Sequence, residues 1–320
     1  MKIGAMAAAF AGQGLDKALE YLVEVGIEAI EITTGNYPGD DLCNPAEMLK
    51  DKGKREEMVG KIKEAGLEIS ALSCHGNPLH PQKDIASAHH ETHRKTVDLA
   101  EEIGVEVVIN FSGCPGGSDS DQTPNWITCP WPDDFKNAVD WQWKEKVVPY
   151  WSEEAKYASG KGIKLAFEMH PGFVVYNTET MLRLREECGE VIGANFDPSH
   201  LFWQGMDPLV SLRALRDCIW HVHAKDCRVD PSNTAKNGAL DTKHYADEIN
   251  RSWIFRTVGY GHGEAFWRDF ISELRMIGYD GVVSIEHEDS LMSLNEGFRK
   301  AVACLKDVIL VEKVEGMWWA

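Results

Sequence analysis

Short apolar runs alternate with longer amphipathic segments from one end of the chain to the other. The runs are rich in Ile, Val, Leu, Phe and Ala, and most are apolar at nearly every position, which is typical of strands buried on both faces of a parallel sheet. Eight strands are predicted, at residues 2–10, 29–34, 68–74, 105–111, 164–169, 191–196, 219–223 and 282–286.

Helices are predicted between these strands, at residues 15–25, 45–65, 85–103, 135–159, 178–188, 208–216, 265–277 and 294–311. Several end at a glycine that precedes the next strand, as a helix C-cap does, for example Gly26, Gly66 and Gly104. The eight alternations predict a single (β/α)8 TIM barrel over residues 1–320. An open doubly wound sheet is the competing fold, but the first turn, A-F-A-G-Q-G-L-D, matches a glycine-rich phosphate loop poorly.

Two connections are unusually long, and both follow strands on the side where barrel enzymes place their sites. Residues 113–134 follow the fourth strand, and residues 227–263 follow the seventh. In the first connection, Trp126 and Trp131 either stack on the C–H face of a sugar or anchor the loop. The tail, residues 312–320, carries Trp318 and Trp319, which predicts a subunit contact in a homo-oligomer or a dock across the barrel.

Composition narrows the classes of function. The chain has 33 basic and 51 acidic residues and a net charge of −18, so it should repel phosphate backbones, and no nucleic-acid partner is expected. Its eight cysteines are scattered without a C-x-x-C pair, which is typical of free thiols in a reducing compartment. Residues 1–12 contain one lysine and an apolar run, which we interpret as the first strand rather than a signal peptide. No apolar stretch reaches membrane-spanning length, so the sequence predicts a cytoplasmic protein without a membrane partner.

Acids and histidines gather at the carboxyl ends of the last four barrel strands. Alternate residues of a strand share a face, so the H-x-H-x-K pattern after residue 220 directs three polar side chains the same way. Taken alone, H-x-H is more often a pair of core histidines, but in a closed barrel the ends of all four strands converge. The converging residues are Glu168 and His170, Asp197 and His200, His221, His223 and Lys225, and Glu286 and Glu288.

Four of these side chains, one from each strand, form a candidate metal site: Glu168, Asp197, His223 and Glu286. Three converging carboxylates would repel one another unless a cation neutralised them. Oxygen donors with one imidazole suit a divalent metal, Mn2+ first, with Mg2+, Co2+, Fe2+ or Zn2+ also possible. The alternative is a solvated acidic rim without a metal.

The motifs F-E-M-H, F-D-P-S-H, H-V-H-A-K-D, G-x-G-x-x-x-W and G-Y-D-G-V-V-S-I-E-H-E-D follow one another along the chain. Together they resemble the xylose-isomerase-like TIM barrels, a superfamily that includes sugar phosphate isomerases and epimerases and the AP endonuclease family 2 (endonuclease IV) proteins. The resemblance implies that the four residues named above match the metal ligands of ketose 3-epimerases and inosose isomerases. It places His200 near the substrate and Arg228 close to a substrate-binding arginine.

The resemblance also implies chemistry at a carbon next to a carbonyl. Glu168 and Glu286 would remove and return an α-proton through a metal-stabilised enediolate, which gives a keto-sugar epimerase or isomerase. Expulsion of a β-substituent would instead give a dehydratase or lyase on an inosose or a 3-keto-glycoside. His170, His200, Lys225, Arg228 and Trp126 are the candidate contacts to the sugar, with support of the metal ligands as the alternative role of the histidines and the lysine.

Two other functions are less favoured. An endonuclease IV-like nuclease needs additional histidines, and His75 is placed for one of them, but the fourth strand ends in Asn110 where another is required. A non-catalytic sugar-binding barrel would be expected to lose at least one of the four ligands. Residues 227–263 are longer than expected for a small epimerase, so we predict that they form a lid or pocket wall for a substrate larger than a free ketohexose.

Overall fold

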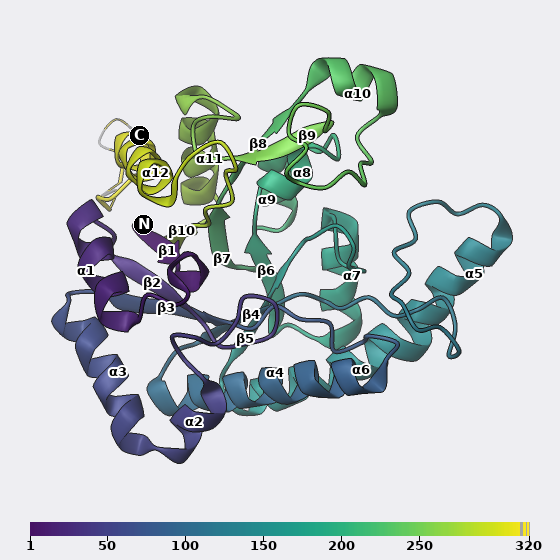
Figure 1. Ribbon diagram of the computed structural model, residues 1–320, viewed down its shortest axis with the longest axis horizontal. Helices are drawn as coiled ribbons and strands as arrows, with labels where there is room; N and C mark the ends of the chain where they lie inside the picture. The colour runs from purple at the N-terminus through teal and green to yellow at the C-terminus, as the bar shows by residue number, and fades with distance from the viewer. Residues whose placement is uncertain (314–315, 318, 320) are drawn as a thin grey trace.

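Eight parallel strands close into a barrel in the computed structural model, which describes residues 1–313, 316, 317 and 319. The strand order around the barrel is β1-β10-β7-β6-β5-β4-β3-β2 (Figure 1). This confirms the predicted (β/α)8 fold. The barrel strands are β1 Lys2–Met6, β2 Ala29–Thr33, β3 Glu68–Ser73, β4 Val107–Asn110, β5 Lys164–Glu168, β6 Ile192–Phe196, β7 Ile219–Ala224 and β10 Val282–Ile285.

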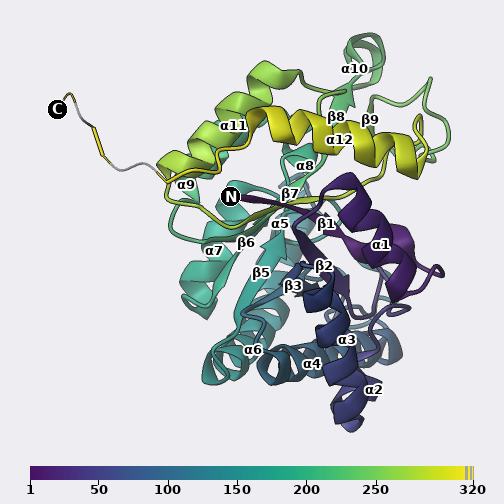
Figure 2. The same ribbon diagram turned by 90° about the vertical axis from the view of Figure 1, so that its left-hand side faces the viewer.

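Helices surround the barrel and bury its outer face. Figure 2 shows α11 and α12 side by side, with α1 next to α12, so the last helices close the ring against the first. The surrounding helices are α1 Leu15–Val25, α2 Pro45–Lys50, α3 Lys52–Glu64, α4 Lys83–Ile103, α5 Asp133–Trp141, α6 Val148–Gly160, α7 Thr178–Cys188, α8 Ser199–Phe202, α9 Pro208–Ala214, α11 Glu264–Met276 and α12 Leu294–Val308.

Three elements differ from the sequence predictions. The first strand ends at Met6 and continues as a 3-10 turn, η1 Ala7–Phe10. The helix predicted over residues 45–65 is divided at Asp51, whose extended backbone ends α2 and whose carboxylate accepts the Lys54 N–H at the start of α3. The helix predicted over residues 135–159 contains the π-helical turn η2 Gln142–Val147, just before Pro149, which has no N–H to continue a regular ladder.

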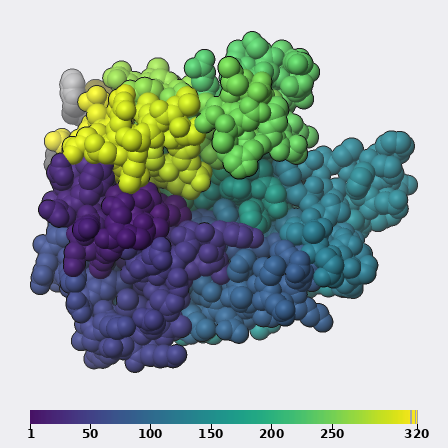
Figure 3. Space-filling model, in the orientation of Figure 1, coloured from purple at the N-terminus to yellow at the C-terminus, as the bar shows by residue number. Residues whose placement is uncertain are grey.

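The long connection after β7, which we call the insertion (residues 227–263), is folded rather than irregular. Its strands β8 Asp226–Val229 and β9 Trp253–Arg256 pair antiparallel, and α10 Pro231–Asn237 lies between them. Figure 1 shows this unit beyond the ends of β6 and β7, and Figure 3 shows it beside α12. The sequence analysis predicted a lid or wall here but missed the hairpin, whose two short strands are separated by residues 230–252.

Aromatic side chains hold the insertion to the barrel. Trp203, just after α8, stacks on Trp253 of β9 with ring centroids 4.8 Å apart. Both belong to a small apolar cluster that also contains Cys227 and Phe255. Trp126, from the connection 113–134, packs against the same cluster, so this tryptophan joins the two long connections.

One carboxylate fixes the base of the insertion. Asp226 Oδ2 accepts the backbone N–H groups of Gly259, Gly261 and His262 at 3.1, 3.0 and 2.8 Å. Its Oδ1 accepts the Cys227 N–H and His262 Nδ1, each at 2.8 Å. A side chain at Gly261 would place its Cβ 2.4 Å from the Cys227 carbonyl oxygen, so the turn must carry glycine at this point. The turn 257–262 is thereby tied to the start of β8.

Three further predictions concern the cysteines, membrane-spanning helices and the two C-terminal tryptophans. All eight cysteines are free thiols. Among the described residues, no helix combines the length and apolarity that crossing a membrane requires. Trp318 lies outside the described residues, and Trp319 is exposed.

Candidate metal centre

The four predicted ligands meet at one end of the barrel. Glu168 ends β5, Asp197 follows β6, His223 lies in β7 and Glu286 follows β10. Each offers one ligand atom, and the four atoms all lie within 4.8 Å of one another. Glu168, Asp197 and His223 are at most 2% exposed, and the Glu286 side chain is 15% exposed. A solvated acidic rim does not describe such a buried group.

Glu168 is surrounded by nitrogen donors. Its Oε1 accepts from His200 Nε2 at 3.0 Å, and its Oε2 accepts from His75 Nε2 at 3.1 Å and from Asn195 Nδ2 at 3.2 Å. His223 Nδ1 lies 3.3 Å from the same Oε2. Burial alone would raise the pKa of this carboxyl, but hydrogen bonds from the three histidines hold the pKa well below its usual value. Glu168 is therefore present as a carboxylate.

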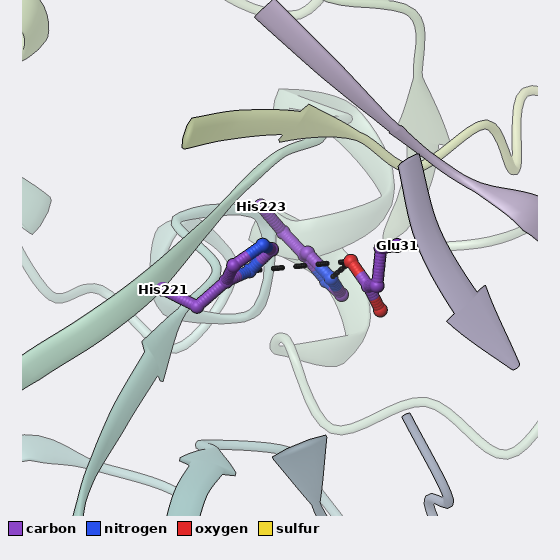
Figure 4. Close-up of side chains that lie close together, drawn as sticks. All are labelled: Glu31, His221 and His223. Carbon is purple, nitrogen blue, oxygen red and sulfur yellow. Dashed lines mark hydrogen bonds and ion pairs between the residues drawn. The ribbon is translucent and has the colours of Figure 1, made fainter. Parts of the chain in front are cut away.

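The two ring nitrogens of His223 face different partners. Nδ1 lies 3.0 Å from Glu286 Oε2, inside the candidate centre. Nε2 lies 2.8 Å from Glu31 Oε2, the contact drawn in Figure 4. Ser284 Oγ donates to the same Glu31 oxygen at 3.0 Å. Burial would raise the pKa of Glu31, but the charge of His223 lowers that pKa to about 2. A carboxylate here holds a proton on Nε2 and leaves Nδ1 as the nitrogen that can bind a metal.

Sequence reasoning missed Glu31. Its only signal is a single acid within the apolar run A-I-E-I-T of β2, an acid that is fully buried in the barrel. A buried acid needs a partner. The partner of Glu31 is His223, the second histidine of the H-x-H motif.

His221 holds a residue that contacts the candidate ligands. Its Nδ1 bonds to Asn195 Oδ1 at 2.9 Å, and its Nε2 bonds to Ser70 Oγ at 3.2 Å. Asn195 in turn donates to Glu168, so His221 orients a neighbour of the ligands. Burial lowers the pKa of His221 to about 4, and the ring is neutral at physiological pH. The prediction that His221 and His223 share one strand face is confirmed.

Lys225 places a buried ammonium among the acids. Its Nζ lies 2.8 Å from Glu286 Oε2, 3.0 Å from Glu288 Oε2 and 3.1 Å from Asp197 Oδ2. Burial would lower the pKa of Lys225, but these carboxylates raise it well above its usual value. The pKa of His200 is similarly raised to about 9, because Asp197 outweighs the effect of burial. The centre is therefore an array of alternating charges.

The donor set fits a divalent cation. Hard carboxylate oxygens with one imidazole nitrogen are the ligands that metals such as Mn2+ and Zn2+ take in proteins. Asp197 Oδ2 is fully buried and has no hydrogen bond, although Lys225 and His200 lie nearby. An oxygen in that position retains lone pairs for a further cation. A divalent metal is thus the group that these residues suit.

A cavity of about 450 Å3 opens above the centre. Glu168 and Glu286 line it, as do His170 and Lys225, two of the predicted sugar contacts. The other lining residues are Met6, Ala8, Ala9, Tyr37, Pro38, His75, Phe111, His287 and Glu288.

The other three predicted sugar contacts lie elsewhere. His200 is fully buried and reaches Glu168 rather than lining the cavity. Arg228 lines a separate cavity of about 340 Å3 on the insertion. Trp126 is not among the lining residues and packs edge-on against Tyr176 with ring centroids 5.4 Å apart. Asn110, at the end of β4, pairs with His93.

Comparison with known proteins agrees with this architecture. A family model described as xylose isomerase-like TIM barrel matches residues 19–308. The chain is 40% identical over 294 residues to the uncharacterised protein YfiH of Bacillus subtilis (strain 168), which covers 91% of this chain and 94% of that protein. It is 27% identical over 132 residues to the inosose dehydratase of Geobacillus thermodenitrificans (strain NG80-2), 41% of this chain and 42% of that protein.

Two solved structures share the fold over nearly the whole chain. The structure of the IolI protein with a bound zinc atom aligns with a TM-score of 0.65 and 18% identity, covering 97% of this chain and 98% of that chain. The structure of the 3-keto-D-glucoside 4-epimerase YcjR from E. coli aligns with a TM-score of 0.61 and 16% identity, covering 96% of this chain and 99% of that chain. With the family model spanning most of its length, the chain belongs to the xylose isomerase-like TIM barrel family.

Proposed function

We propose that the protein is a divalent-metal-dependent epimerase or isomerase of a keto-sugar, acting by transfer of an α-proton. The observation that carries the proposal is the pair Glu168 and Glu286, whose Oε2 atoms lie 3.3 and 3.0 Å from the same His223 nitrogen at the floor of an open cavity. The Glu286 carboxylate can remove a proton on one side of this point, and Glu168, which takes a proton from His200 Nε2 at 3.0 Å, can return that proton on the other side.

Glu168, Asp197, His223 and Glu286 would hold the metal. When bound there, a divalent cation polarises a carbonyl oxygen and stabilises the negative charge that develops on it. Side chains of the protein itself supply the remaining functions of the site.

Glu286 is the partly exposed member of the pair and takes up the proton from the carbon next to the carbonyl. Glu168 lies on β5, which β6 and β7 separate from β10, so it addresses the sugar from another side. Return of a proton on the opposite face of the same carbon inverts it, and return to the former carbonyl carbon gives an isomer. Lys225 and His170 line the cavity: the Lys225 ammonium can donate to sugar hydroxyls, and the neutral His170 ring can donate or accept.

Dehydration is the second candidate, and the inosose dehydratases among the relatives favour it. The first step is the same: the C–H bond breaks and its proton passes to Glu286. The electron pair left on the α-carbon then forms a C=C bond with the β-carbon as the bond from the β-carbon to its hydroxyl breaks. The leaving hydroxyl takes a proton from Lys225, which lines the cavity, and departs as water. The proton on Glu286 then passes to Lys225 Nζ, 2.8 Å away, which restores both groups.

Proton exchange in deuterated water tests the proposal. Protein loaded with Mn2+ is mixed with keto-sugars, inososes and 3-keto-glycosides, and the α-proton signal is followed by NMR. Exchange with formation of a new epimer or ketose is the expected result, and exchange with loss of water would move the function to dehydration. Absence of exchange from all substrates, with metal binding verified, would contradict both.

Matched variants identify the proton carriers. Glu168→Gln and Glu286→Gln should each abolish exchange, whereas Glu264→Gln, at an exposed carboxylate on α11, should leave it unchanged. Full activity of Glu286→Gln would show that another group moves the proton.

A further inference from the structure

A second cavity of about 410 Å3 adjoins the cavity of the candidate metal centre. His170 and Glu288 line both of them, so the two cavities meet at these residues. The insertion provides half of the outer lining. The outer cavity is lined by His170, Tyr245, Ile254, Phe255, Glu288 and Ser290.

We propose that the outer cavity binds a second, uncharged sugar ring that is linked to the reacting ring. The substrate would then be a keto-glycoside of at least two rings rather than a free keto-monosaccharide. The identity of the reacting ring rests on the proposed function, whereas the binding of a second ring does not.

The wall of the outer cavity offers an aromatic surface that is held in place. Tyr245 is 51% exposed, and its ring lies nearly parallel to Phe255, with centroids 5.8 Å apart and planes at 19°. The guanidinium of Arg251 lies 4.3 Å from the Tyr245 ring centroid, and Arg251 is itself buried. A large, partly exposed aromatic side chain with a polar tip is suited to the apolar C–H face and the hydroxyls of a sugar.

The polar residues of the outer cavity favour a sugar over an apolar group. Glu288 and Ser290 are exposed there, and both can bond to hydroxyls. An apolar aglycone would offer no hydrogen-bonding group to the Ser290 hydroxyl or to the free oxygen of Glu288. The Glu288 carboxylate also repels anions, which disfavours a phosphorylated or carboxylated substituent.

The position of Glu288 makes a spanning ligand the best fit. Its side chain is 48% exposed, and its Oε2 lies 3.0 Å from Lys225 Nζ, which belongs to the inner cavity. Glu288 therefore stands where the two rings of a bound glycoside would be joined. A ligand confined to the inner cavity would not reach Tyr245 and Ser290, which line only the outer cavity.

Binding experiments test the outer subsite without any turnover. Isothermal titration of the Mn2+-loaded protein compares glucose with a panel of disaccharides: cellobiose, maltose and gentiobiose. At least one disaccharide should bind about 10-fold more tightly than glucose. Tyr245→Ala should weaken that disaccharide by roughly 3- to 10-fold, the range expected for one aromatic contact, and leave glucose unchanged.

A matched variant controls for loss of an exposed tyrosine. Tyr260→Ala removes a ring that is 42% exposed and lines neither cavity, so it should change neither affinity. Equal or absent binding of glucose and every disaccharide, or unchanged disaccharide affinity in Tyr245→Ala, would overturn the subsite.

The two proposals fail separately. A disaccharide preference that depends on Tyr245, without proton exchange on any keto-glycoside, would retain the subsite and reject the epimerase. Proton exchange on free keto-monosaccharides that is as fast as on keto-disaccharides, and that does not change in Tyr245→Ala, would retain the epimerase and reject the subsite.

Discussion

Replacement of Glu31 by glutamine changes one charge next to His223 while keeping the shape of the side chain. In the native barrel, Glu31 Oε2 accepts from His223 Nε2 and Ser284 Oγ, whereas Oε1 is buried and has no hydrogen bond. The glutamine amide can take two orientations. With its oxygen toward His223, the proton stays on Nε2, but the amide NH2 occupies the place of Oε1 and lacks an acceptor. With its NH2 toward His223, Nε2 must accept, and the proton moves to Nδ1, where it blocks the metal.

The magnitude follows from these two orientations. An unsatisfied buried NH2 costs about 1–3 kcal/mol in the free energy of unfolding. Loss of a carboxylate that orients a ligating histidine weakens metal binding by about 10- to 100-fold, which is roughly 1.4–2.7 kcal/mol. We therefore expect Glu31→Gln to be folded, less stable and weaker in metal binding by at least about 10-fold.

The assay is a Mn2+ titration in which free Mn2+ is measured by electron paramagnetic resonance. Glu154→Gln serves as the matched control, because Glu154 is also buried and also faces a histidine, His93, but lies between α4 and α6. It should lose stability and keep its metal affinity. A Mn2+ affinity of Glu31→Gln within twofold of the native value would refute the role of Glu31, as would an equal loss in Glu154→Gln.

Three further outcomes are expected. Mn2+ at about 100 times its dissociation constant should stabilise the protein by about 2.7 kcal/mol in thermal unfolding, and chelation should reverse this; a similar gain in His223→Ala would place the metal elsewhere. Burial would raise the pKa of Glu154, but the contacts with His93 and Arg94 outweigh burial and lower this pKa. The charge of Glu154 therefore stabilises the fold fully above pH 4.5, the usual pKa, and this stabilisation is lost as the pH falls through the lower pKa of the native state. The difference in unfolding free energy between native protein and Glu154→Gln should therefore shrink below about pH 4.5, and a difference that grew on acidification would contradict this sign. Asp226→Asn turns an NH2 toward backbone donors, so hydrogen exchange at residues 257–262 should accelerate; native-like protection there would show that other contacts fix the turn.

The sequence was sufficient to predict the barrel and the convergence of four candidate ligands, because both follow from periodicity. Each buried strand is apolar until its last residues, and the carboxyl ends of parallel strands must meet. Glu168 and Glu286 could therefore be placed together although they are far apart in the chain. How these groups bind metal and move protons stays a prediction that the experiments above address.

The parts that sequence reasoning missed depend on pairings that leave no periodic signal. Glu31 is one acid in the middle of a strand, and its partner His223 lies on a strand from the other half of the chain. The β8–β9 hairpin consists of two four-residue strands, which are too short to show alternation. Arg228 lies in β8 and lines the cavity of the insertion instead of the inner cavity, and Trp126 packs against the apolar cluster that holds the hairpin to the barrel.

Because Asp226 binds the turn 257–262, the insertion can be exchanged as a unit without a change in the barrel. Asp226 pairs with Arg256 in the hairpin register, so both ends of the segment are fixed at one point, one residue beyond Lys225. Changing the length of a loop whose ends are already held together costs little entropy. Residues 230–252 could thus be replaced in a chimaera, or diverge among relatives, and alter what the outer cavity admits while the carboxylates beneath it keep their positions.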